Sequence, residues 1–319
     1  MRATKLRAGR CTARILAVAA VVFLHASAIK AGNPDLPPEA KVGLEKLNNG
    51  DPDGAIVHFR ALQTSAPDHP LGYLLEGEAL GWKNYCGTLE LKWGMVEFGK
   101  RGKQPGDEEY LALAEKTIRL ANERMARTES AEMHLYAGLA LSLEARLYGM
   151  RGENRATAHA GVKAREEFLR AKELDPQMTD ADTGLGLYNY YIDTLSGIVK
   201  VLRFFMGIPG GNKQEGIRQL EAAMSGGGFT AADARFYLAK NLRTYDQQYE
   251  RAAAVLEPLT QQYPRNSIFM LLLANFNAEL SRKEKAIAGL RAVTDQMCCE
   301  VTCSLRVRTV ADALMATLK

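Results

Sequence analysis

The sequence lacks the motifs of the common hydrolytic enzymes. Neither the serine-nucleophile motif Gly-x-Ser-x-Gly nor the zinc motif His-Glu-x-x-His occurs in the 319 residues. Only five histidines are present, and His58 and His134 fall within segments expected to be helical, where a histidine is more often structural. We therefore expect a protein that is not an enzyme, with no catalytic residues, no cofactor and no bound metal.

Proline is also scarce, at 11 residues, and Ala, Leu, Glu, Lys and Arg dominate the chain. Few helix breakers among strong helix formers favour an all-α protein. Hydrophobic residues make up 47% of the sequence, which is enough for a large core. Charged residues make up 24%, which argues against a chain that is disordered throughout.

A basic surface is missing once the N-terminal segment is set aside. Six of the 41 Lys and Arg residues precede residue 32, and the first acidic residue is Asp35. The body therefore has 35 basic and 37 acidic residues, so it is nearly neutral despite the formal charge of +4 for the whole chain. Nucleic-acid binding needs a basic face that neutralises phosphates, and we do not expect it here.

Apolar runs long enough to span a membrane are absent too. The apolar block near the N-terminus is Ile15–Leu24. A membrane-spanning helix needs about 20 apolar residues. Five positive charges precede the block, and the small-x-small sequence Ala26–Ala28 follows it, which is the order of a secretory signal peptide. We predict a signal peptide at residues 1–31 and an exported protein, periplasmic in a bacterium. A retained anchor and a mitochondrial transit peptide are the alternatives.

What the body does contain is a recurring spacing. A small residue is followed after four positions by a large apolar one, after three more by a small or aliphatic one, and after five more by Pro or Gly. Steps of four and three keep residues on one face of a helix, and the Pro or Gly ends it. The copies, two of them without the final breaker, are Ala55/Phe59/Leu62/Pro67, Ala114/Ile118/Ala121, Ala164/Phe168/Ala171/Pro176, Gly216/Leu220/Ala223/Gly228, Ala252/Leu256/Leu259/Pro264 and Ala286/Leu290/Val293.

A second helical pattern, which contains a small residue, precedes most copies. Turns such as Asn49–Asp51 separate the two helical patterns of a unit. Its small residues are Gly43, Gly138, Gly186, Ala239 and Ala274. Each unit therefore consists of a helix, a turn, a helix and a break. This organisation resembles the tetratricopeptide-repeat (TPR) family, whose unit has about 34 residues.

The resemblance implies a right-handed superhelical solenoid of about six TPR-like helix-turn-helix units within residues 32–319. A capping helix is expected after the last unit, because a terminal repeat otherwise exposes its apolar face. The expected units are 36–69, 70–127, 128–179, 180–229, 230–265 and 266–297, with the cap at 301–318.

The middle of the chain also resembles a narrower group. The segments Gly184–Tyr191 and Leu195–Phe205 are similar to eukaryotic TPR proteins linked to inclusion-body clearance and lipid droplets, and to uncharacterised bacterial TPR proteins. That resemblance implies an adaptor and not an enzyme.

The family resemblance also implies where a partner binds, because the first helix of each unit lines the inner groove. Lys240, Arg243 and Asn275 could hold a peptide carboxylate there. We hypothesise a scaffold that binds a protein or peptide partner on this concave face; an ordinary solvated surface is the alternative. The expected groove residues are Leu139, Leu187, Tyr190, Lys240, Arg243 and Asn275.

A second hypothesis rests on the apolar insert 195–208. It could form a helix that contacts a membrane or lipid peripherally, or an extra helix buried against the solenoid.

A third hypothesis concerns the cysteines that remain after signal removal, Cys86, Cys298, Cys299 and Cys303. They allow three pairings, which the sequence does not choose between. A bond from Cys298 or Cys299 to Cys303 would fasten the cap to the last unit. The same three cysteines could instead form a thiol or metal module.

Overall fold

The computed structural model describes residues 32–89, 91, 102–195, 200, 203, 207–295 and 301–318. The expected signal peptide, residues 1–31, lies outside them. The described part of the body is built from thirteen α-helices. Within it, each helix is either too short or too polar to cross a membrane.

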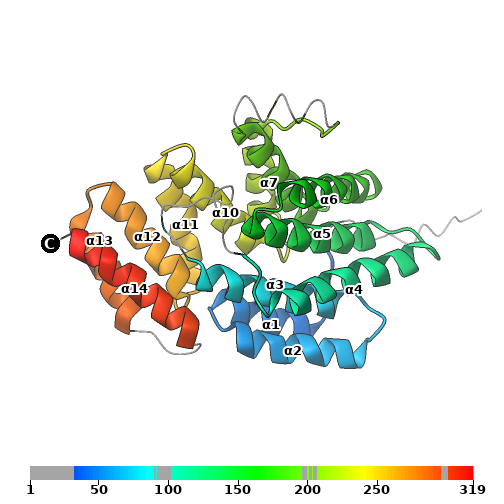
Figure 1. Ribbon diagram of the computed structural model, residues 1–319, viewed down its shortest axis with the longest axis horizontal. Helices are drawn as coiled ribbons and strands as arrows, with labels where there is room; N and C mark the ends of the chain where they lie inside the picture. Colours follow the sequence, from blue (N-terminus) through cyan, green and yellow to red (C-terminus); the bar gives the residue numbers. More distant parts are fainter. Residues whose placement is uncertain are drawn as a thin grey trace, which may run out of the picture. The chain divides into compact units, whose positions relative to one another are not determined.

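The helices pack in sequential pairs, one pair for each repeat unit, and a single helix follows the last pair (Figure 1). This confirms the predicted fold class, an all-α TPR-like solenoid with a C-terminal cap. The pairs are α1 (Pro38–Asn48) with α2 (Pro52–Ser65), α3 (Leu71–Gly87) with α4 (Asp107–Met125), α5 (Ala131–Arg151) with α6 (Asn154–Leu174), α7 (Asp180–Thr194) with α9 (Lys213–Ser225), α10 (Ala231–Thr244) with α11 (Tyr249–Gln262), and α12 (Ser267–Glu279) with α13 (Lys283–Asp295), followed by α14 (Val301–Thr317).

Polar residues at the helix starts explain several of these boundaries. The Asp51 carboxylate accepts a hydrogen bond from the backbone N–H of Gly54, at 2.9 Å, and caps α2. The Asn266 side chain caps α12 in the same way by accepting from Ile268 and Phe269. Each cap satisfies backbone donors that have no partner within the helix.

The recurring spacing places the residues through which the two helices of a unit pack. In the second helices, the small and large members of the pattern are buried, except Ile118 of α4, which is half-buried; Phe168, for example, is 1% exposed. A Cβ atom placed on Gly138 of α5 would lie 2.7 Å from the Phe168 ring, and one on Gly186 of α7 would lie 2.8 Å from Leu220. The glycines of the first helices therefore admit the large side chains of the second helices.

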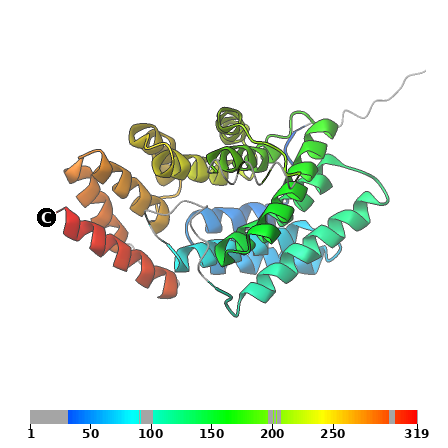
Figure 2. The same ribbon diagram turned by 45° about the horizontal axis from the view of Figure 1, so that its top comes forward.

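The first units also contact the last ones. The Asn266 amide donates to the backbone oxygen of Asn48, at 2.9 Å, and thereby joins the turn before α12 to the end of α1. Helix α3 packs against the cap, α14, and both views show the end of α3 beside α14 (Figures 1 and 2). These contacts join segments about 200 residues apart, which the repeat pattern alone does not specify.

Candidate partner-binding site

The first helices of five units enclose a cavity of about 40 Å³. A cavity needs about 10–15 Å³ of such space to hold one water molecule, so this one has room for a few waters or the end of a side chain. It lies among α1, α3, α5, α7 and α10. Its walls are mainly apolar, and the apolar residues that matter below are Leu44, Trp82, Leu139, Leu187, Phe229 and Tyr237.

One ion pair lies in the wall of the cavity. Arg146 of α5 contacts Glu78 of α3 at 3.0 Å, and the two side chains are 15% and 13% exposed. The guanidinium also lies 5.9 Å from the centre of the Tyr237 ring, within the range of a cation–π contact. Gly81 makes room for it, since a Cβ atom there would lie 2.8 Å from the Arg146 Nη1 atom.

A second carboxylate, Asp233 at the start of α10, lines the same cavity. Burial raises its pKa to about 7, and the negative charge of Glu78 adds to the rise. Arg146 and a hydrogen bond from Trp82 oppose the rise without cancelling it. The cavity thus contains a carboxylate whose charge its surroundings compensate only in part.

Two of the expected groove residues, Leu139 and Leu187, lie in the wall of this cavity. Tyr190 lies elsewhere, fully buried, and its hydroxyl donates to Asp246 at 2.7 Å. In the structure, Tyr190 joins α7 to the turn after α10.

Lys240, Arg243 and Asn275 are buried, and none is more than 8% exposed. The Lys240 ammonium donates to the Tyr85 hydroxyl at 2.7 Å, and Arg243 pairs with Glu279 at 2.9 Å. The carboxylate-binding role expected for these three residues stays a prediction; in this structure they are covered and do not face solvent.

Helix α3 covers Lys240 and the aromatic residues beside it. Trp82 packs against Phe236 of α10 at 4.8 Å and Phe269 of α12 at 5.8 Å between ring centres. Tyr85, one turn further along α3, also packs against Phe236 and meets Lys240. Around Phe236, Lys240 and Phe269 the inner surface of the last two units is therefore occupied by α3, and the cavity beside Trp82 remains.

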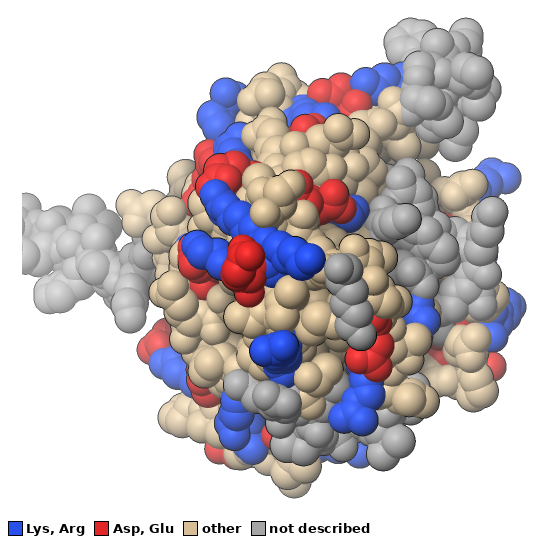
Figure 3. All heavy atoms as spheres, turned by 90° about the vertical axis from the view of Figure 1, so that its left-hand side faces the viewer, with Lys and Arg blue, Asp and Glu red and all other residues tan. Residues whose placement is uncertain are grey.

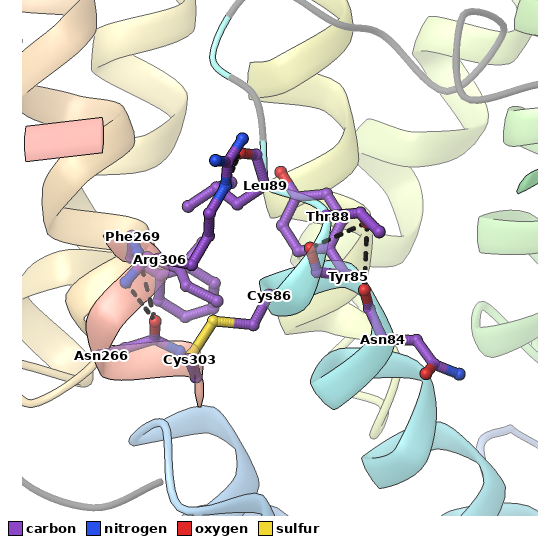
Figure 4. Close-up of a disulfide and its surroundings, with 10 residues drawn as sticks. Asn84, Tyr85, Cys86, Thr88, Leu89, Asn266, Phe269, Cys303 and Arg306 are labelled. Atoms are coloured by element: carbon purple, nitrogen blue, oxygen red, sulfur yellow. Dashed lines mark hydrogen bonds between the residues drawn. A yellow bond between two sulfur atoms is a disulfide. The ribbon is translucent and has the colours of Figure 1, made fainter. Parts of the chain in front are cut away.

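The covering helix is fastened by a disulfide between Cys86 of α3 and Cys303 of α14 (Figure 4). Next to it, Arg306 of α14 donates to the backbone oxygen of Leu89 at 2.9 Å. Of the three pairings that the sequence leaves open, the structure forms the one that joins Cys303 to Cys86, which the fold brings to it from a distant unit. The alternative bond of Cys303 to Cys298 or Cys299 is not formed. Cys298 and Cys299 themselves lie outside the described residues.

The disulfide also bears on the thiol or metal hypothesis. Cys303 has no thiolate to offer a metal while its sulfur is bonded to Cys86, so the three-cysteine module is not formed. Among the described residues, no group of three or more His, Cys, Asp or Glu side chains is arranged to hold a metal ion.

The lipid hypothesis falls mostly on residues that the structure does not describe. Within the insert 195–208, only Leu195, Lys200, Arg203, Gly207 and Ile208 are described. Its membrane or lipid contact stays a prediction.

The charged surface is mixed on the face that holds the C-terminal helices. Figure 3 shows Lys and Arg side chains next to Asp and Glu on the visible part of that face. Pairs such as Arg282 with Glu250, at 2.7 Å, account for part of this pattern. This agrees with the near-neutral charge of the body.

Sequence reasoning missed the charged residues of the cavity. A signal for one of them was present: Glu78 follows Gly77, just as Leu44, Leu139 and Leu187 follow the glycines of their own first helices. The residue after the small one thus faces the cavity in four units. The sequence has no comparable signal for Arg146 or Asp233.

No family model matches the chain, and no curated protein sequence does either. Among solved structures, the chain is matched to the crystal structure of yeast Tom70 with 13% identity and a TM-score of 0.29, over 88% of this chain and 82% of that one. The paired helices and buried repeat positions of the chain define its class: a TPR-like helical-repeat fold.

Proposed function

We propose that this chain is an exported scaffold that binds a segment of another protein at the cavity enclosed by α1, α3, α5, α7 and α10. The observation that carries the proposal is the composition of the cavity wall. Leucine and aromatic side chains from five helices surround the charged groups of Glu78, Arg146 and Asp233. Apolar walls with a few convergent polar groups are typical of binding sites.

The size of the cavity favours a side chain of a protein partner over a free metabolite. Pockets for drug-sized ligands measure about 300–1,000 Å³, far more than the 40 Å³ found here. A partner segment can lie across the inner face and place one residue in the cavity. Leu44 and Leu187 are partly exposed at the wall and would contact the rest of that segment.

The packing around the site supports binding without large rearrangement. Each wall helix packs against its neighbours in the solenoid, and the disulfide ties α3 to the cap. A preformed site avoids part of the entropic cost of ordering on binding. TPR-like folds are typical of non-catalytic scaffolds, and we propose no catalytic role.

Export is proposed on two grounds. The N-terminal segment has the charge, apolar block and small-residue order of a signal peptide. The pairing of Cys86 with Cys303 fits a protein of an oxidising compartment, where disulfides persist.

Affinity capture from the cell envelope tests the proposal with two matched variants. In the first, Leu44→Glu and Leu187→Glu place charges at the apolar wall. In the control, Val57→Glu changes a residue of α2 that is 67% exposed and lies outside the cavity. We expect the partner recovered by the parent protein to be retained by the control and lost from the cavity variant. A partner that both variants retain would contradict the proposed site.

A further inference from the structure

The charges of the cavity do not balance. Glu78 and Asp233 supply two carboxylates, and Arg146 supplies one cation, which pairs with Glu78. Within the part of the chain that the structure describes, Asp233 forms no ion pair. Its other charged or titratable neighbours are Asp180 at the start of α7, and Tyr237 and Tyr263, which contribute no positive charge.

The surroundings of Asp233 suit a cation. Trp82 and Tyr237 form aromatic walls of the cavity, and aromatic faces attract ammonium groups. Asp233 lines the cavity, so a group that enters the cavity can reach it. The available 40 Å³ matches the end of an extended side chain better than a bulky group.

We propose that the cavity binds a lysine side chain of the partner, with its ammonium group paired to Asp233 and its methylene groups against the apolar wall. This inference rests on the proposed function and specifies the chemistry of the partner. Arg146 remains paired with Glu78, so the added cation brings the site to charge balance.

Binding should therefore depend on pH. The pKa of Asp233 in the empty site is about 7, because burial and Glu78 disfavour the ionised carboxylate. An ammonium group favours the ionised form and lowers that pKa. Binding of a lysine side chain is thus expected to release a proton near neutral pH and to tighten as the pH rises from 6 to 8.

The test uses a side-chain analogue, so that it does not depend on the unknown partner sequence. The probe is the butylammonium ion, compared with 1-butanol and pentanoate at equal ionic strength. Trp82 reports binding: the chain has two tryptophans, and Trp93→Phe leaves Trp82 as the only one. The indole N–H signal of Trp82 in an NMR titration gives the affinity of each probe.

We expect butylammonium to bind at least about tenfold more tightly than 1-butanol, since a charge-assisted contact contributes at least that factor. Asp233→Asn should remove this preference, whereas Asp68→Asn, at an exposed turn, should keep it. Should Asp233→Asn not fold, the parent protein at pH 5 and pH 8 provides the same comparison, with weaker butylammonium binding expected at pH 5.

Three results would overturn the inference: equal affinities for butylammonium and 1-butanol, an unchanged preference in Asp233→Asn, or no response of Trp82 to any probe. The scaffold proposal would survive them if the Leu44→Glu/Leu187→Glu variant still lost its partner. A cation preference without any envelope partner would instead support the lysine site and contradict the scaffold proposal.

Discussion

Replacing Cys86 and Cys303 by alanine removes the covalent link between α3 and the cap. The two residues are separated by 217 positions, and the chain-entropy relation gives about 5 kcal/mol for closing a loop of that length in the unfolded chain. Strain and residual structure usually reduce the measured value, so we expect the free energy of unfolding to fall by about 3–5 kcal/mol. The parent and the variant should both carry Cys298→Ser and Cys299→Ser, which prevents new disulfides.

The assay is urea denaturation combined with native-state hydrogen exchange. End repeats of a solenoid open locally, and the noncovalent hold on α14 comes from its packing on α3, α12 and α13 and from the contact of Arg306 with Leu89. The amides of α14 should therefore lose protection first in the variant. A free energy of unfolding within about 0.5 kcal/mol of the parent, with α14 protection unchanged, would refute this role of the disulfide.

Three further predictions concern the interior. Phe168→Ala should lower the free energy of unfolding by about 3–5 kcal/mol in urea, because the ring is 1% exposed and fills the space beside Gly138; a loss below about 1 kcal/mol would contradict this. Asp107→Asn should cost about 2–3 kcal/mol in the same assay, because the buried Arg151 loses its carboxylate at 2.8 Å and keeps only Glu153 at 3.7 Å, and an unaltered denaturation midpoint would count against it. Asp233 should make the parent protein less stable as the pH rises from about 4 through 7, because its folded pKa of about 7 exceeds the unfolded value and the folded state then binds more protons. Asp233→Asn should remove that part of the pH dependence; identical profiles of unfolding free energy against pH for the two proteins would exclude it.

The fold could be predicted because its determinants are local. Steps of four and three residues define one face of each helix, and Ala164, Phe168 and Ala171 lie on that face and are buried. The resemblance to the TPR family implied that Leu139 and Leu187 lie on the first helices, and there they line the cavity. The pattern within one unit is enough to carry the resemblance.

The covering of Lys240 could not be predicted in this way. Its partner Tyr85 is 155 positions away, in another unit, and the two meet only because the curvature of the whole array brings α3 to α10. The pairing of Cys86 with Cys303 depends on the same approach. Contacts between distant repeats depend on small rotations summed over the units, which the repeat spacing does not determine.

The most direct test of the central claim is site-specific photo-crosslinking in the cell envelope. A photoreactive phenylalanine analogue at Leu187 places the reactive group at the cavity wall, and the same analogue at Val57 places it on the exposed side of α2. The proposed function predicts a discrete crosslinked protein with the probe at Leu187 and none with the probe at Val57. Crosslinks to a partner only from Val57 would contradict binding at the cavity.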